Sequence, residues 1–168
     1  MSEWWSAGVW AGSGLPLRRF NRLPTDEAIQ LLRPCLAVDR WVRVVVAGRD
    51  YRRLDDLFET AREAAFPFTG AELEAALAAV RPVDVVPLAR EFESRSQAQL
   101  REQLADGVAQ YQRRFARPFL IRRDGRSDRQ VLVQLWERLG HDIDTEDRVL
   151  AQQLRENAVA SLARTISD

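Results

Sequence analysis

Apolar residues recur every three or four positions through most of the chain, which is the spacing of an amphipathic helix. Residues 54–66 show the pattern most clearly. Their apolar side chains fall on one helical face: Leu54, Leu57, Phe58, Ala61 and Ala65. We therefore predict a helix here that turns this face to the core. Trp41 and Trp136 lie on similar stripes and are interpreted as core residues.

Residues that favour helix ends divide the pattern into segments. Thr25 begins a helix that Pro34 interrupts, and Gly48 ends the helix that follows. Two later helices begin with capping boxes: Thr69 with Glu72, and Ser127 with Gln130. These start and stop signals predict helices on both sides of the middle of the chain.

The middle of the chain is interrupted by proline. The helix that starts at Thr69 must end before Pro82, because the residue before proline avoids the helical region. A long polar helix is predicted over 88–114 and a last helix over 144–165, with a short strand-like piece at 117–127. We therefore predict an all-α fold of seven or eight helices in one compact domain.

The first twenty residues differ from the rest. Glycines and Pro16 argue against regular structure, whereas Trp4, Trp5 and Trp10 argue against a free tail. We expect residues 1–20 to form an irregular extension that packs on the domain surface or at a subunit interface, with a lid over a pocket as the alternative. Residues 21–168 are then the helical domain.

Composition excludes several classes of function. Lys+Arg and Asp+Glu are both 25, so the near-zero net charge does not predict nucleic acid or an anionic membrane as a partner. No lysine is present, which excludes a Schiff-base lysine. Cys35 and His141 are each the only residue of their type, so a Cys/His zinc site is not expected. We interpret His141 as a surface-turn residue and expect no metal site, no membrane span and a reduced, cytoplasmic setting.

Four stretches together resemble one enzyme family: FNRLPTDEA, RWVRVVVAGRDYRRLDDL, YQRRFARPFLIRRDGRS and ERLGHDIDTEDRVLAQQLRE. The chain from about residue 20 onward resembles the 2-oxo-4-hydroxy-4-carboxy-5-ureidoimidazoline (OHCU) decarboxylases, lyases of the purine-derived ureide pathway that form allantoin. The resemblance implies an all-α fold, catalysis without a cofactor, a small-molecule substrate and a homodimer.

The residues that carry the family's chemistry differ here. The family's catalytic histidine precedes a proline, and Arg81-Pro82 stands at that step, with Val80 as the alternative alignment; neither residue is a histidine. In the family's next motif, Ser94 is kept, but Gln97 replaces a glutamate. The family's late arginine corresponds to Ser161, with Arg164 one turn away. The segment that in the family presents backbone groups to the substrate is kept as Phe119, Leu120 and Ile121.

An arginine cannot exchange protons near neutral pH, because its pKa exceeds about 12. Arg81 could instead bind a carboxylate or stabilise an oxyanion. One hypothesis is an enzyme of altered chemistry that acts on an anionic or aromatic small molecule in a specialised biosynthetic pathway. It would be a decarboxylase, lyase or cyclase with Arg81, Ser94 and Gln97 as the reacting set. Further substrate-binding candidates are Pro82, Asp84, Glu93, Phe119, Leu120, Ile121, Ser161 and Arg164.

Two other hypotheses stay open. The chain could be a non-catalytic binding or scaffold protein that keeps the fold and the dimer. It could also be a true OHCU decarboxylase of urate catabolism with relocated catalytic residues, among which Glu102 is a candidate.

Overall fold

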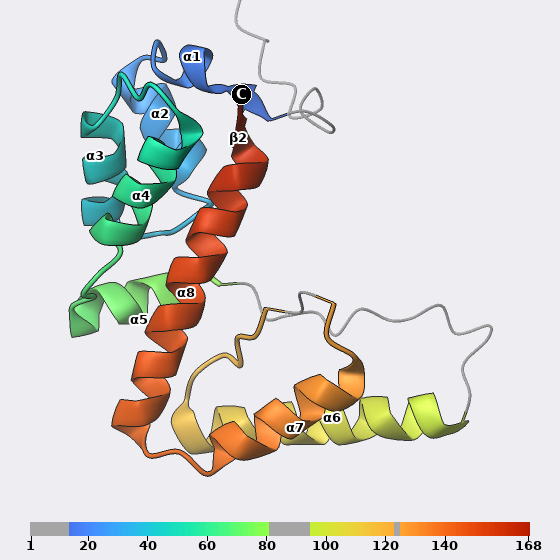
Figure 1. Cartoon of the computed structure of the whole chain (residues 1–168). Coiled ribbons are helices and arrows are strands. Elements are labelled where there is room, and N and C mark those ends of the chain that lie inside the picture. Colours follow the sequence, from blue (N-terminus) through green and yellow to red (C-terminus); the bar gives the residue numbers. More distant parts are fainter. Residues whose placement is uncertain (1–13, 81–94, 123–124) are drawn as a thin grey trace, which may run out of the picture. The chain divides into compact units, whose positions relative to one another are not determined.

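The computed structural model describes residues 14–80, 95–122 and 125–168. These residues contain eight α-helices and one pair of two-residue strands (Figure 1), so the predicted all-α class is confirmed. The chain divides into two units, residues 1–72 with 155–168, and residues 73–154. Each unit is described by itself.

The first unit joins the beginning of the described chain to its end. Strand β1 (Leu15–Pro16) pairs in parallel with β2 (Ile166–Ser167), and α1 (Leu17–Phe20) follows with Phe20 fully buried. Gly14 fits here because a Cβ would lie 3.2 Å from the backbone oxygen of Arg164. Residues 15–20 are therefore regular structure, not the irregular extension expected. Trp4, Trp5 and Trp10 lie outside the described residues.

Three helices form the body of the first unit: α2 (Thr25–Leu32), α3 (Asp39–Ala47) and α4 (Leu54–Ala64). The predicted interruption at Pro34 is confirmed, since α2 ends before it. Trp41 of α3 is fully buried, and its indole Nε1–H donates to the Ala61 carbonyl of α4 at 2.8 Å. This hydrogen bond fixes α3 against the apolar stripe of α4, whose Leu57 and Ala61 are fully buried.

An arginine–glutamate pair connects the first turn of the next helix to this body. Arg40 donates to the Glu72 carboxylate at 2.7 Å and to the Ala64 carbonyl at 2.7 Å. Glu72 lies in the first turn of α5 (Gly70–Ala79) and forms the predicted capping box with Thr69. Its carboxylate accepts from the Thr69 N–H, and its own N–H donates to the Thr69 hydroxyl. Hydrogen bonds from Arg40 and Thr69 lower the pKa of Glu72 to about 2, so the carboxylate is ionised at neutral pH.

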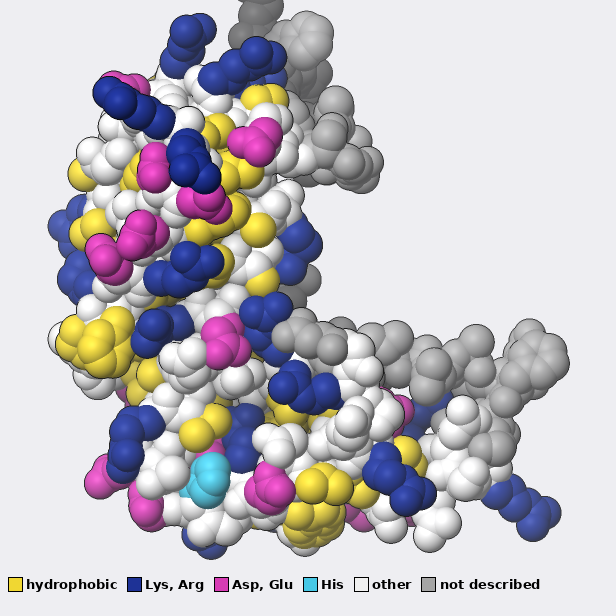
Figure 2. Space-filling view, viewed as in Figure 1, with side chains coloured by type: hydrophobic (Ala, Val, Ile, Leu, Met, Phe, Trp, Pro, Cys, Tyr) yellow, Lys and Arg dark blue, Asp and Glu magenta, His cyan; other side chains and the backbone are white. Residues whose placement is uncertain are grey.

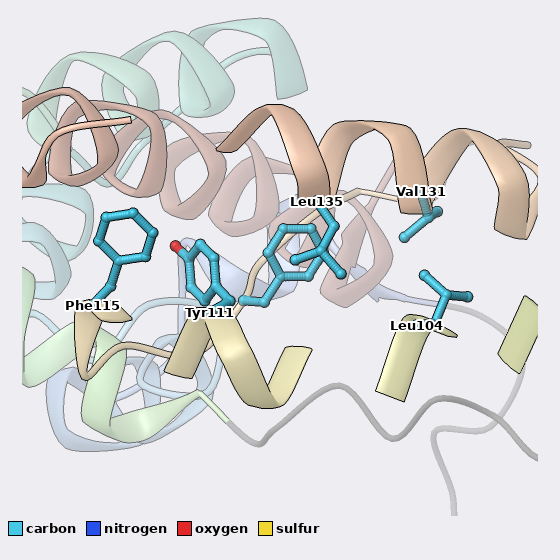
Figure 3. Close-up of a cluster of buried hydrophobic side chains, with 6 residues drawn as sticks. Leu104, Tyr111, Phe115, Val131 and Leu135 are labelled. Carbon is cyan, nitrogen blue, oxygen red and sulfur yellow. The ribbon is translucent and has the colours of Figure 1, made fainter. Parts of the chain in front are cut away.

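The second unit is built on two helices that pack side by side, α6 (Arg95–Phe115) and α7 (Asp128–Leu139). Their shared core is shown in Figure 3 and contains Leu104, Tyr111, Phe115, Phe119, Val131 and Leu135. Gly107 permits the close approach of the helices, because a Cβ there would lie 2.5 Å from a Leu135 methyl. Residues 88–94 of the predicted polar helix lie outside the described residues.

The ends of α7 and α8 follow the sequence signals closely. Ser127 and Gln130 form the predicted capping box. The last helix, α8, spans Ile143–Thr165, and the Asp142 carboxylate accepts a 2.7 Å hydrogen bond from the Thr145 N–H in its first turn.

The interpretation of Trp136 as a core residue is wrong, because 49% of it is exposed on α7. Among the described residues, no helix is both long enough and apolar enough to cross a membrane.

Candidate functional site

The sequence-predicted site residues fall partly outside the described structure. Arg81, Pro82, Asp84, Glu93 and Ser94 lie outside the described residues. Gln97 is described, and its side chain is exposed in the first turn of α6. The predicted convergence of Arg81, Ser94 and Gln97 therefore stays a prediction.

Ser161 and Arg164 belong to the part of α8 in the first unit. Ser161 is half-buried, and its backbone carbonyl accepts a hydrogen bond from the Thr165 hydroxyl at 2.9 Å. Arg164 is exposed. Their role in holding a substrate carboxylate is likewise a prediction.

The segment Phe119–Ile121 of the second unit is the best defined part of the predicted site. It follows the end of α6, where Ala116 adopts the left-handed backbone conformation at φ 51°. That conformation costs about 1 kcal/mol in a residue other than glycine, so the surrounding packing must compensate for it. Phe119 and Leu120 are both buried, and Ile121 packs against the α6–α7 core.

Arg138 of α7 lies directly against this segment. Its Nη1 donates to the Leu120 carbonyl. The guanidinium carbon is 4.7 Å from the centre of the Phe119 ring, which is close enough for a cation–π contact. The segment Phe119–Ile121 is the predicted substrate wall, and one of its backbone acceptors, the Leu120 carbonyl, is thus used inside the fold. The expectation that the other backbone groups of this wall face a substrate is untested.

Glu146 of α8 neutralises Arg138 within the core. The Nε atom of Arg138 lies 2.9 Å from Oε1 of Glu146, and both residues are almost completely buried. The Tyr111 hydroxyl donates to the same carboxylate oxygen. Burial, followed by the hydrogen bond to Glu146, raises the pKa of Tyr111, so the phenol is neutral and can act as a donor. We call Tyr111, Arg138 and Glu146 the buried polar network.

His141 joins this network from its edge. Its Nδ1 lies 2.8 Å from Oε2 of Glu146, and 30% of its side chain is exposed. The interpretation of His141 as a surface-turn residue is therefore incomplete, because a fully buried carboxylate holds its ring. The sequence gives no local signal for this contact, because residues five apart are not neighbours on a helix and nothing near Glu146 marks it as buried.

The described residues contain no cluster of three or more His, Cys, Asp or Glu side chains that could hold a metal ion. The groups that define the described part of the site are thus a guanidinium, a carboxylate, a phenol and an imidazole. Such a set can fix a backbone carbonyl and donate hydrogen bonds, and its imidazole can exchange protons.

Comparison with known proteins agrees with the sequence resemblance. The family model for OHCU decarboxylase matches residues 21–160, and the chain belongs to this family. A solved structure titled "Crystal structure of (S)-allantoin synthase" has a similar fold, with a TM-score of 0.67 at 14% sequence identity. The similarity covers 89% of this chain but 54% of the synthase, so the chain spans about half of that protein's length. None of the curated proteins compared with the chain matches it.

Proposed function

We propose that this chain is a cofactor-independent, lyase-like enzyme that binds a small carboxylate and no longer decarboxylates OHCU at a useful rate. The observation that carries the proposal is the Arg81-Pro82 step, which stands where the family resemblance places a catalytic histidine. We further propose that it acts as a homodimer in the cytoplasm, in a specialised biosynthetic pathway.

The chemical reason lies in the proton balance of a decarboxylation. Loss of carbon dioxide leaves a carbanion or enolate, to which a nearby group must return a proton. A histidine can do this near neutral pH, but an arginine stays protonated. Gln97 also lacks the carboxylate that the resemblance implies at its position. The substitutions keep groups suited to binding and remove both groups suited to proton transfer.

The geometry of the second unit supports the proposal that the segment Phe119–Ile121 still forms one wall of a binding site. The buried polar network holds the segment Phe119–Leu120 through the Arg138 hydrogen bond to the Leu120 carbonyl. A buried ion pair of this kind often contributes little to stability compared with apolar packing. Its contribution is better explained by the fixed position that it gives to the segment, because a preformed wall lowers the entropic cost of binding.

Binding of carboxylates can be tested by thermal shift and calorimetry with a panel of small mono- and dicarboxylates. We expect at least one to raise the melting temperature of the wild-type chain, and Arg81→Gln to abolish that shift. Arg43→Gln is the matched control, because Arg43 is exposed on α3 in the first unit. A shift that survives in Arg81→Gln would contradict the proposed role of Arg81.

Catalysis can be tested by restoring the family's residues. In the double variant Arg81→His, Gln97→Glu, we expect allantoin formation from OHCU to rise above the wild-type rate. Ser161→Arg added to this double variant should raise it further, since Ser161 stands where the resemblance places the carboxylate-binding arginine. No gain in either variant, with the fold retained, would contradict the assignment of these positions.

One observation favours a second candidate, a non-catalytic binding or scaffold protein. The Leu120 carbonyl is engaged by Arg138 and is not free to accept from a substrate along that bond. Under this alternative, no carboxylate in the panel stabilises the chain. A true decarboxylase using Glu102 is the remaining alternative, and wild-type turnover of OHCU that is lost in Glu102→Gln would identify it.

A further inference from the structure

The pair formed by His141 and Glu146 has the arrangement of a proton-transfer site. Oε1 of Glu146 accepts from Arg138 and Tyr111, whereas Oε2 faces Nδ1 of His141 at 2.8 Å. Because the first oxygen is held on two sides, the carboxylate cannot rotate freely. The orientation of the imidazole is thereby fixed by a group that is itself fixed.

This contact also determines which ring nitrogen is available. An ionised carboxylate can only accept, so Nδ1 of His141 must carry the proton that it donates to Glu146. In the neutral ring, the lone pair then resides on Nε2, on the side of the ring away from the carboxylate. Figure 2 shows the chain's only histidine, in cyan, at the molecular surface. The imidazole therefore combines a buried partner with a ring that is 30% exposed.

An open surface pocket of about 440 Å³ borders this ring and is lined by Arg114, Phe115, His141, Asp142, Ile143 and Asp144. The pocket combines apolar surface with charge. Ile143 is 63% exposed and supplies apolar surface to the pocket. Hydrogen bonds from Thr145 lower the pKa of Asp142, so this carboxylate is ionised.

The lining charges decide the class of ligand. Two carboxylates, Asp142 and Asp144, accompany one guanidinium, Arg114, whose Nη2 already donates to the His141 carbonyl at 2.9 Å. The other charges near the ring, Arg138 and Glu146, neutralise each other within the core. Arg148 adds a second guanidinium beside the pocket, since its charge lowers the pKa of Asp142 and its Nε donates to the Asp144 carbonyl at 3.2 Å. Two guanidiniums thus balance the two carboxylates, so the pocket suits an uncharged molecule.

We propose that His141 is the general base of a second site, oriented by Glu146, which takes small, uncharged carbon or nitrogen acids. In the step, Nε2 accepts a proton from the ligand, and the electron pair of the broken C–H or N–H bond stays on the ligand. Glu146 stabilises the imidazolium that forms, and the proton then leaves Nε2 to water. The site does not involve Arg81 or Gln97, so it is independent of the proposed carboxylate-binding function.

The experiment uses 5-nitrobenzisoxazole, an uncharged carbon acid, with the whole 168-residue chain. Removal of its C3 proton breaks the N–O bond and releases a coloured nitrile-bearing phenolate, so one absorbance reports the proton transfer without an oxidant or a cofactor. We expect the wild-type chain to accelerate this reaction beyond an equal concentration of free imidazole. Deuterium at C3 should slow the protein-dependent reaction, because the C–H bond breaks in the step.

The informative variant is His141→Asn. An asparagine amide reaches about the position of Nδ1, so it can still donate to Glu146, but it has no basic nitrogen. We expect the protein-dependent rate of the folded variant to be lower by a factor of about 10 or more, because a positioned general base accelerates a reaction by about 10²–10⁴-fold. A residue with only a structural role would leave the rate unchanged in His141→Asn.

A control variant separates a positioned base from any surface imidazole. In the double variant His141→Asn, Gln112→His, the single histidine moves to an exposed position of α6. We expect this variant to be as slow as His141→Asn alone. A wild-type rate in either variant would overturn the proposal.

Nuclear magnetic resonance gives a test that does not depend on turnover. Because the chain has one histidine, ¹⁵N-histidine labelling yields one imidazole, whose nitrogen shifts report the tautomer directly. We expect the neutral ring to carry its proton on Nδ1. A proton on Nε2 would overturn the proposal, since the outward nitrogen would then have no lone pair to act as a base. Failure of these tests would leave the carboxylate-binding proposal unaffected.

Discussion

Each unit of the molecule uses an arginine–glutamate pair to join chain segments, but the two pairs differ greatly in burial. In the first unit, the Arg40 and Glu72 side chains are 39% and 18% exposed. In the second, the Arg138 and Glu146 side chains are 5% and 1% exposed. Water can replace a lost partner in the first pair, whereas it cannot easily reach the second. The comparison teaches that burial determines how much stability is lost when one partner of an arginine–glutamate pair is removed. The loss is small for the partly exposed pair and large for the buried one.

The largest effect is expected from breaking the buried pair. Glu146→Ala leaves Arg138 as an uncompensated buried charge and also removes an acceptor from Tyr111. We predict a loss of about 3–5 kcal/mol in the free energy of unfolding, measured by urea denaturation. The double variant Arg138→Met, Glu146→Leu should be clearly more stable than Glu146→Ala. Equal stability of these two variants would show that the charge left behind is not the cause.

A smaller effect is expected when one neutral member of the buried polar network is removed. Tyr111→Phe keeps the ring, which lies 4.8 Å from Phe115 and 5.1 Å from Phe119 between ring centres, and removes only the hydroxyl. We predict a loss of about 1.5–3 kcal/mol, the usual range for a hydrogen bond to a charged group. Denaturation of Tyr111→Phe beside wild type measures it. A loss as large as that of Glu146→Ala would mean that ring packing, not the hydroxyl, had been disturbed.

The exposed pair should show its contribution through pH. The pKa of Glu72 falls from 4.5 to about 2 in the folded chain, mainly through the hydrogen bond from Arg40. A carboxyl whose pKa is lowered by folding stabilises the folded state above its unfolded pKa. Its contribution is lost as the pH falls from about 4.5 towards 2.

We therefore predict that Glu72→Gln lowers stability by about 1 kcal/mol at pH 7, a value discounted for the exposure of Arg40. Below about pH 2, the variant and wild type should converge. Melting temperatures recorded across this range test both parts. A constant difference at all pH values would show that packing, and not ionisation, is the cause.

The smallest effect is expected at a pair whose side chains are both mostly exposed. The side chains of Arg33 and Asp39 are 59% and 68% exposed, although they lie 3.0 Å apart. Arg33→Ala should change the free energy of unfolding by less than about 0.5 kcal/mol. A loss above about 1 kcal/mol would contradict the claim that burial, rather than pairing, determines the size of these effects.

Sequence reasoning predicted the helices well because their ends are coded locally. The capping boxes at Thr69 and Ser127 and the interruption at Pro34 depend on neighbours within a few residues. It failed at Trp136, since a three- to four-residue stripe does not reveal which face of a helix another element covers. It also assigned residues 15–20 to an irregular extension of the helical domain, because the pairing of β1 with β2 joins residues about 150 positions apart.

The candidate site was harder to predict for a related reason. Arg138 and Glu146 resemble ordinary polar positions of exposed helices, and nothing local marks them as buried partners. His141 was judged by its place in a loop, although its partner Glu146 is deep in the core. The family resemblance supplied the positions of Arg81 and Gln97, which periodicity alone would not have distinguished from other polar residues.

The central claim is that the chain has the OHCU decarboxylase fold without that family's proton-transfer chemistry. Circular dichroism during incubation of the wild-type chain with freshly generated OHCU tests it most directly, because enzymatic decarboxylation yields one enantiomer of allantoin and spontaneous decay yields both. We predict no optical signal beyond that of the protein-free reaction. Rapid appearance of a single enantiomer would contradict the account.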